Sequence, residues 1–479
     1  MARNGLREFI RTYVRAIHDS NAAIFAGAGL SRPAGFVDWK ELLREIADDL
    51  ELDVDKEYDL IALAQYHVNE VGNRGKINSV LIENFTDGTR TTKNHELLAK
   101  LPIKTYWTTN YDKLIEASLE RSNKLVDLKI VKENMSNPRP ESDAVVYKMH
   151  GDISLPHEAV LTKDDYEAYE DKRSVFSTAL RGDLTSKTFL FIGFSFDDPN
   201  LSYILSRIRA LLGQHTSNHY CFMKKVNRKD YKTEQEFYYN EVKQTLKIKD
   251  LKRYSITVLL VEEYEEVTEI LEKINYLVQA KNVFISGSAK EFGDWGESRS
   301  FEFSTKLSKA IIKNKNNVVS GFGVGIGSCI ISGALEELYE SNVQNVEKRL
   351  KSRPFPQNTG GKLPLKDIWT RYREEMLNNV GISIFIFGNK IDEKTGNLID
   401  ANGMIEEFEI SLKKGVVPIP VGATGYTSCK LWQRVMSDFD DLIGIESLKN
   451  LYEELGDREK TDEEIIENIL KIVNELNKI

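Results

Sequence analysis

The sequence predicts an α/β protein of two domains, each a mainly parallel sheet flanked by helices. Short apolar runs typical of buried strands recur along the chain, and segments with helical spacing of apolar residues separate them. Several of these runs end in a glycine turn, and the pattern of strand into glycine turn starts afresh near residue 283. We therefore expect a first domain over residues 1–278 and a second over 279–479.

The composition argues against several classes of protein. Of the 479 residues, 41% are hydrophobic and 29% are charged, which is ordinary for a globular protein with a large core. The net charge of -9 makes duplex nucleic acid a poor partner, because its phosphates attract basic surfaces. The longest apolar runs, such as 382–387, are too short to span a bilayer, and the N-terminus lacks a signal-peptide core. We expect a cytoplasmic protein that binds neither nucleic acid nor membrane.

The cysteines predict neither a disulfide scaffold nor a zinc site. Cys221, Cys329 and Cys429 lie far apart in the sequence, and no two of them form a Cys-x-x-Cys pair. Such sparse usage suits a reducing cytoplasm. We therefore expect no metal.

The first half of the chain begins with a helix and continues as a series of strands. Apolar residues between 6 and 18 recur at helical spacing, and the run 22–26 is typical of a buried strand that ends at a glycine turn. Further strands are expected at 105–109, 144–148, 188–192, 219–223 and 256–261. An amphipathic helix over 262–280 then leads to the second domain.

Small or polar residues follow four of these strands. They are Gly27, Ala28, Gly29 and Ser31, then Asn110 and Asp112, then His150, and finally Gly193 and Ser195. The carboxyl ends of parallel strands meet at one edge of a sheet, where α/β proteins bind ligands. Small residues in the first turn would let backbone amides and a helix N-terminus approach a pyrophosphate. A tight packing turn, or helix caps formed by Asn110 and Asp112, would explain the same residues without a ligand.

Taken together and in this order, the four segments resemble the sirtuin-type NAD-binding fold. That family carries a Gly-Ala-Gly-x-Ser turn, a Thr-x-Asn-x-Asp segment, a His-Gly pair and a late Gly-x-Ser, found here at 27–31, 108–112, 150–151 and 193–195. The resemblance covers roughly residues 1–275. The chain departs from sirtuin deacylases because it lacks paired cysteines for zinc, and because Arg-Pro-Ala-Gly-Phe follows the glycine turn in place of a Pro-Asp-Phe-Arg form. Both departures fit the bacterial sirtuin-like defence effectors, which hydrolyse NAD+.

The chemistry of NAD+ hydrolysis suits two of these residues. Nicotinamide leaves as a neutral molecule, so the enzyme must stabilise oxocarbenium character, hold the ribose and deliver a water. The neutral amide of Asn110 can hold a ribose hydroxyl or the water, and His150, with an ordinary pKa near ~6.5, can accept a proton. Asp112 either orients the site or caps the next helix. The resemblance places Gly193 and Ser195 on the adenosine side.

The second half contains two more glycine turns after strands, at 286–288 and 320–328. The second turn has four glycines at alternating positions before a helical pattern, which is the form of a phosphate cradle. Residues 281–479 resemble the SLOG superfamily, which includes the lysine-decarboxylase-like phosphoribohydrolases. Their Pro-Gly-Gly-x-Gly-Thr-x-x-Glu signature is altered here to a stretch at 387–390, an insertion and a stretch at 403–407. We therefore expect nucleotide binding in this half without hydrolysis.

The SLOG-like half is expected to bind its ligand through glycine turns and cations. The residues concerned are Gly287, Ser288, Gly323, Gly325, Arg371, Arg373, Lys390 and Glu406. Arg371 and Arg373 stand two apart on an expected helix and cannot share a face, so at most one points inward. A solvent-exposed charge is the alternative for each cation.

A sirtuin-like half followed by a SLOG half resembles the Thoeris anti-phage defence effectors. The resemblance implies that a TIR-domain partner protein makes a cyclic ADP-ribose isomer, which binds the SLOG domain and releases NAD+ hydrolysis. NAD+ is then the substrate, with no prosthetic group, and its depletion arrests or kills the infected host. The resemblance also implies a homotetramer or a higher assembly. The alternatives are a sirtuin-like protein deacylase or ADP-ribosyltransferase, a non-catalytic nucleotide sensor, and a phosphoribohydrolase in the second half.

Overall fold

The computed structural model describes residues 2–85, 90–196, 198–212, 217–356, 358, 360–392 and 395–478. The chain divides into two compact units, residues 1–275 and 276–479. The division falls inside α14 (Glu265–Ala280), close to the boundary after residue 278 that the sequence suggests. Each unit is built on its own sheet, so the two are described separately.

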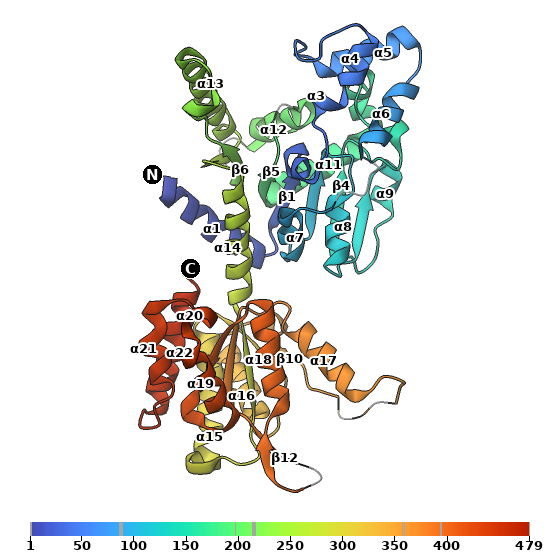
Figure 1. Ribbon diagram of the computed structural model, residues 1–479. Coiled ribbons are helices and arrows are strands. Elements are labelled where there is room, and N and C mark those ends of the chain that lie inside the picture. The colour runs from blue at the N-terminus through green and yellow to red at the C-terminus, as the bar shows by residue number, and fades with distance from the viewer. Residues whose placement is uncertain are drawn as a thin grey trace. The chain divides into compact units, whose positions relative to one another are not determined.

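A seven-stranded sheet forms the centre of the first unit (Figure 1). Its strands are β1 (Ala22–Ala26), β2 (Thr105–Thr108), β3 (Val126–Lys129), β4 (Ala144–Lys148), β5 (Thr188–Ile192), β6 (His219–Lys224) and β7 (Ile256–Val261). Every pairing is parallel, in the order β3-β4-β2-β1-β5-β6-β7. Because β2 and β5 flank β1, strand addition changes direction there, and such switch points are where open α/β sheets bind ligands.

Helices cover both faces of this sheet. They are α1 (Ala2–His18), α2 (Ala28–Ser31), α7 (Lys93–Lys100), α8 (Leu114–Arg121), α9 (Lys132–Ser136), α10 (Lys163–Glu167), α11 (Tyr169–Ser186), α12 (Pro199–Leu212) and α13 (Glu234–Lys252), together with α14. Phe25, Trp107 and Phe191 share a core with residues of α11 and α12. Ile24 and Tyr106 point the other way, toward α7 and α8. Alternate residues of each strand therefore serve opposite layers.

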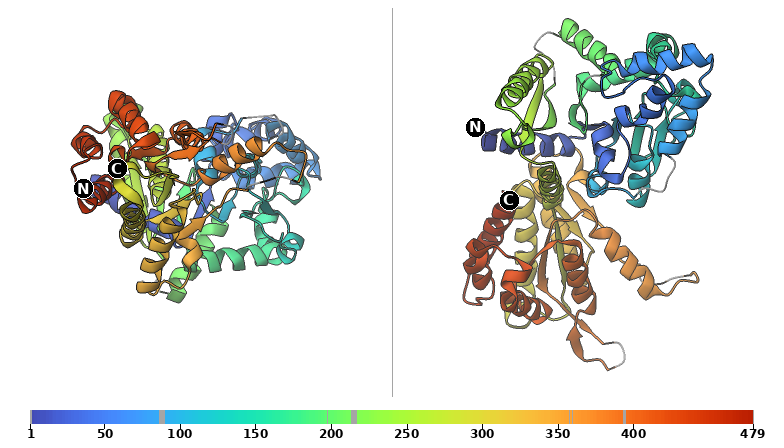
Figure 2. Two further views of the ribbon diagram at one scale, coloured as in Figure 1. Left: turned by 90° about the horizontal axis from the view of Figure 1, so that it is seen from below. Right: turned by 45° about the horizontal axis from the view of Figure 1, so that its top comes forward.

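Four further helices form a separate group that we call the helical insert, residues 38–85. They are α3 (Trp39–Leu42), α4 (Arg44–Asp49), α5 (Leu60–Val71) and α6 (Gly75–Phe85). The insert has its own apolar core, and Ala159 and Leu161 from the loop after β4 are buried in it. Within the first unit, the insert and α13 lie on opposite sides (Figure 2, right).

The second unit has a five-stranded parallel sheet in the order β10-β9-β8-β11-β14. Its strands are β8 (Asn282–Ser288), β9 (Asn317–Ser320), β10 (Leu350–Ser352), β11 (Ile382–Phe387) and β14 (Val417–Pro420). The accompanying helices are α15 (Gly296–Lys313), α16 (Gly327–Glu340), α17 (Leu365–Met376), α18 (Asn402–Lys414), α19 (Tyr426–Ser437), α20 (Phe439–Leu442), α21 (Lys449–Glu454) and α22 (Asp462–Leu476). An antiparallel hairpin of β12 (Asn389–Ile391) and β13 (Leu398–Asp400) projects from this unit (Figures 1 and 2).

The two-sheet α/β architecture expected from the sequence is confirmed. The helix α22 contributes apolar residues, such as Ile469 and Ile472, that are fully buried in the second core. The expected strands do not include β3, β10, β12 and β13. These have only three or four residues each, and polar side chains interrupt them, so no apolar run marks them.

Candidate functional site

The register of the first sheet brings the predicted segments to one edge. Ala26 pairs with Thr108 on one side and with Ile192 on the other, and Thr108 pairs with Lys148. The residues that follow these four strand ends therefore emerge at the same level. Strand pairing alone thus places the glycine turn, the Asn110 segment, the His150 segment and the Gly193 segment along the carboxyl edge.

Asn110 joins two of these segments directly. Its buried side-chain amide Nδ2 donates to the carbonyl of Gly27 at 3.1 Å and to Oγ of Ser31 at 3.0 Å. Its backbone amide donates to Oγ1 of Thr108 at 2.9 Å. The side chain is held by both contacts, so it does not act as a helix cap here.

The glycine turn is packed backbone to backbone against the end of β5. The amide of Gly27 donates to Ile192 O at 3.0 Å, and the amide of Gly29 donates to Gly193 O at 2.8 Å. A Cβ on Gly193, whose φ is +64°, would lie 2.1 Å from the amide nitrogen of Leu30. Packing therefore requires these glycines, as the alternative explanation proposed. The expected helix is also short, since α2 has four residues, so its dipole offers a pyrophosphate little attraction.

Three other residues of the predicted site, which lie around this turn, differ in their exposure to solvent. Ser31 is buried beneath the turn, whereas Ala28 and Ser195 are exposed at the edge. A ligand along this edge would therefore meet Ala28 and Ser195 before it met the buried Ser31.

His150 faces a carboxylate that the sequence analysis did not select. Its Nε2 lies 3.1 Å from Oδ2 of Asp198, and both side chains are at least nine-tenths buried. The rings of Tyr166 and Tyr169 stand edge-on to the imidazole, with centroids 5.6 and 6.4 Å away. Asp198 follows β5 and His150 follows β4, so the pair reaches across the ends of the two strands between them.

The surroundings of Asp198 keep it ionised. Burial alone would raise the pKa of Asp198, but the nearby His150 and the hydrogen bonds from Leu201 N and Tyr166 Oη lower it below its ordinary value. A carboxylate in this position would stabilise an imidazolium at His150. Its location six residues after β5, beyond the Gly-x-Ser segment, could have marked it as a candidate.

Asp112 serves the local backbone. Its Oδ1 accepts from Leu114 N at 2.9 Å at the start of α8, and its carbonyl accepts from Nζ of Lys148. Its Oδ2 is buried without a hydrogen-bond partner among the described residues. Of the two roles open to Asp112, these contacts favour the cap.

Lys148 is a fully buried cation that ties the Asn110 and His150 segments together. Its Nζ lies 3.1 Å from Oε1 of Glu116, contacts Oδ2 of Asp152 and donates to the carbonyls of Tyr111 and Asp112. Burial would lower the pKa of Lys148, but the two carboxylates raise it on balance. The lysine is therefore charged, and it positions the backbone on both sides of the site. Sequence reasoning missed it because it lies inside a strand.

In the second unit, the predicted turns also meet at the carboxyl edge. A Cβ on Gly323 would lie 1.9 Å from Gly287 O, and a Cβ on Gly325, whose φ is +84°, would lie 2.0 Å from Ala289 O. Ser288 pairs with Phe387 at the end of β11 and donates from Oγ to Asn389 O at 3.3 Å. As in the first unit, the glycines are required for close backbone contact.

The predicted cations of the second unit lie in contrasting settings. Arg373 is buried, with Nη1 2.8 Å from Oε2 of Glu406 and Nε 3.4 Å from Oε1 of Glu407. The side chain of Arg371 is 80% exposed, and Lys390 on β12 is exposed as well. Arg371 and Arg373 thus point to different sides of α17, as their spacing requires.

Two general features of the described residues bear on cofactors and membranes. Within the ranges described above, no three His, Cys, Asp or Glu side chains gather as a metal site would require. None of the helices described is both long and apolar enough to cross a membrane.

Comparison with known proteins assigns both halves. Residues 104–246 match a SIR2-like domain, and residues 266–476 match the Sir2- and TIR-associating SLOG family. The chain is 46% identical to the NAD(+) hydrolase ThsA of Cytobacillus dafuensis, over 98% of this chain and 96% of that protein. It is also 46% identical to the NAD(+) hydrolase ThsA of Bacillus cereus strain MSX-D12, over 98% of each. The chain belongs to the ThsA family of NAD+ hydrolases.

A more distant relative concerns defence. The Defense-associated sirtuin 2 of Bacillus subtilis is 23% identical over 347 residues, which are 67% of this chain and 33% of that protein. Within this ThsA-family chain, the SIR2-like match contains Asn110, His150 and Asp198. Gly27 lies outside it and is joined to the site by the hydrogen bond from Asn110.

Proposed function

We propose that the first unit hydrolyses NAD+ to ADP-ribose and nicotinamide, with Asn110 and His150 as catalytic residues. The single observation that carries this proposal is the pairing of His150 with Asp198 at the sheet edge where Asn110 is held. Membership of a family of NAD+ hydrolases supports the same chemistry.

The proposed reaction needs one base and no general acid. The bond between C1′ of the ribose and the pyridinium nitrogen breaks, and its electron pair neutralises the departing nicotinamide. A water attacks C1′ and gives its proton to His150, and Asp198 stabilises the imidazolium that forms. The Asn110 amide holds the ribose hydroxyl or the water without adding charge. Gly27, Ala28, Gly29, Ser31, Gly193 and Ser195 would line the bound dinucleotide, and Asp112 would support the Asn110 segment from the start of α8.

We further propose that a cyclic ADP-ribose isomer binds the second unit and releases this activity, so that the protein depletes NAD+ in anti-phage defence. The glycine turns of this unit meet at one edge, and the side chains of Arg371 and Lys390 are exposed to solvent, where a phosphate can reach them. Arg373 is already neutralised by Glu406 and Glu407 and is the weaker candidate. The ligand acts only if it binds the active state more tightly than the inactive one.

The proposed activator would come from a TIR-domain partner protein, and the protein would work in the cytoplasm as a homotetramer or a higher assembly. The match to a Sir2- and TIR-associating family supports the first part. Light scattering of the purified chain, with and without a cyclic ADP-ribose isomer, measures the oligomeric state. A monomer under both conditions would contradict it.

The central experiment follows nicotinamide and ADP-ribose when full-length protein is incubated with NAD+, with and without each cyclic ADP-ribose isomer. We expect cleavage that rises sharply with one isomer and is lost in His150→Ala. NAD+ that binds and is not consumed under any condition would indicate a sensor. Nicotinamide release accompanied by ADP-ribosylated protein, or by loss of acyl groups from a peptide, would indicate a protein-modifying enzyme.

A further inference from the structure

The backbone of His150 is held by the loop that follows β4. We call residues 156–162 the strap. The amide of Val160 donates to His150 O at 2.8 Å, and the strap packs against Gly151, whose φ is +92°. A Cβ on Gly151 would lie 3.1 Å from Cα of Ala159. The position of His150 therefore depends on where the strap lies.

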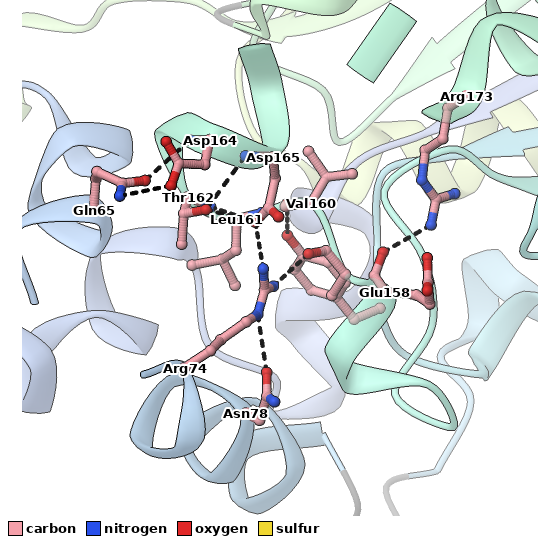
Figure 3. A network of polar contacts seen from close by, with 12 residues as sticks. Gln65, Arg74, Asn78, Glu158, Val160, Leu161, Thr162, Asp164, Asp165 and Arg173 are labelled. Atoms are coloured by element: carbon pink, nitrogen blue, oxygen red, sulfur yellow. Dashed lines mark hydrogen bonds and ion pairs between the residues drawn. The ribbon is translucent and has the colours of Figure 1, made fainter. Parts of the chain in front are cut away.

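One arginine of the helical insert, Arg74, is hydrogen-bonded to the strap (Figure 3). Arg74 stands between α5 and α6, and its Nη2 donates to the carbonyl of Ala159. Its Nη1 lies 2.6 Å from Oδ2 of Asp165, and its Nε donates to Oδ1 of Asn78 at 3.1 Å. All three nitrogens of the guanidinium thus have partners, an arrangement that the single nitrogen of an ammonium group could not reproduce.

Asp165 holds the end of the strap through further hydrogen bonds. Its Oδ2 accepts from Leu161 N at 3.0 Å and from Thr162 N at 2.9 Å. Burial would raise the pKa of Asp165, but Arg74 and these backbone donors lower it on balance. The carboxylate is therefore charged and links the arginine to two further strap amides.

Two other groups hold the strap from the side of the sheet. Tyr111, the residue after Asn110, donates from Oη to Val160 O at 2.7 Å. Arg173 on α11 donates from Nη2 to Glu158 O at 2.7 Å. The insert therefore supplies one of several contacts that hold the strap.

We propose that Arg74 is a positioning residue for His150. It fixes the strap at Ala159, the strap fixes the backbone of His150 and Gly151, and the imidazole is thereby kept within reach of Asp198. The helical insert then contributes to catalysis through one side chain that does not touch the reacting atoms. This inference rests on the proposed role of His150 in NAD+ hydrolysis.

The test compares Arg74→Met and Arg74→Lys in the full-length protein, assayed for NAD+ cleavage with and without the cyclic ADP-ribose isomer used for the unaltered protein. We expect Arg74→Met to lower kcat about 10- to 100-fold while KM changes less than about 3-fold, because a displaced base costs turnover more than binding. The pH profile of kcat should also shift, because the proton acceptor then lies farther from the Asp198 carboxylate. Arg74→Lys, which keeps the charge near Asp165, should restore part of kcat.

Arg44→Met is the matched control. Arg44 is an exposed arginine of the same insert, paired with Asp55 at 3.1 Å, and its loss should leave kcat and the pH profile unchanged. If Arg74→Met does not fold, Tyr111→Phe removes one strap hydrogen bond, and we expect a smaller fall in kcat with the same direction of pH shift.

Two outcomes would overturn the inference and leave the proposed function intact. They are a folded Arg74→Met, or a folded Tyr111→Phe if the first cannot be made, with the kcat and pH profile of the unaltered protein. Unaltered protein that leaves NAD+ intact, or His150→Ala that still cleaves it, would instead contradict the proposed function.

Discussion

The carboxyl edges of the two sheets share the same backbone arrangement but carry different side chains. In both, glycines bring a turn into backbone contact with the end of a neighbouring strand, as Gly193 does in the first unit and Gly323 in the second. The first edge then carries a buried imidazole beside a carboxylate. At the second, the buried cation Arg373 is already paired with two carboxylates, and Arg371 faces solvent.

This difference is what the proposed roles require, a reactive edge in the first unit and a binding edge in the second. An imidazole next to a single carboxylate can take and return a proton, whereas an arginine stays charged and can only hold an anion. The shared architecture therefore carries no function by itself, and the side chains at the strand ends decide what each unit does.

The comparison is tested most severely by removing the reactive group. His150→Ala and Asn110→Ala should each lower NAD+ turnover about 10²- to 10⁴-fold, because one loses the base and the other the amide that orients the ribose or water. Nicotinamide release measures the effect. Nucleotide binding to the second unit, followed by calorimetry, should survive in both variants. Turnover within a few-fold of the unaltered protein would mean that the site is assigned wrongly.

A second prediction concerns the paired cation of the second unit. Arg373→Met should lower the free energy of unfolding by about 3 kcal/mol, because it leaves the buried Glu407 without its partner. Burial raises the pKa of Glu407, so the loss should shrink as acid protonates that carboxyl group. Denaturant unfolding at neutral and acidic pH measures both effects. Equal free energies of unfolding for Arg373→Met and the unaltered protein at neutral pH would argue against a structural role for the pair of Arg373 with Glu407.

Asp198 should have an intermediate effect on turnover. Asp198→Asn should lower kcat about 10-fold to 100-fold, since the imidazolium at His150 loses its carboxylate. Because the folded pKa of Asp198 is lowered, its contribution to stability is present above the ordinary value near ~3.9 and disappears as pH falls through the folded value. The stability gap between the two proteins should therefore close on acidification. A gap that widens in acid would contradict the lowered pKa.

The sequence anticipates the parts of the fold that depend on local pattern and misses those that depend on contacts. Short apolar runs identify β1 and β5, and helical spacing identifies α14. Asn110 and His150 are selected because they follow strands. Asp198, Lys148 and Arg74 escape selection because each has an ion-pair partner at least 32 residues away in the sequence. These partners are His150, Glu116 and Asp165 respectively. Only the register of the sheet and the path of the strap bring those partners together.

The smallest effect is expected at the exposed cation of the second unit. The pair of Arg371 with Glu375 is 3.9 Å long and largely solvated, so Arg371→Met should change the free energy of unfolding by less than about 0.5 kcal/mol. If Arg371 meets a phosphate of the activator, the concentration of cyclic ADP-ribose isomer needed for half-maximal NAD+ cleavage should rise about 5- to 10-fold. Lys471→Met removes a similarly exposed pair on α22 and serves as the control. An equal rise of this concentration in both variants would mean that only the net charge of the protein matters. A rise confined to Arg371→Met would place the activator beside α17, and the second edge would then bind an anion where the first carries the imidazole.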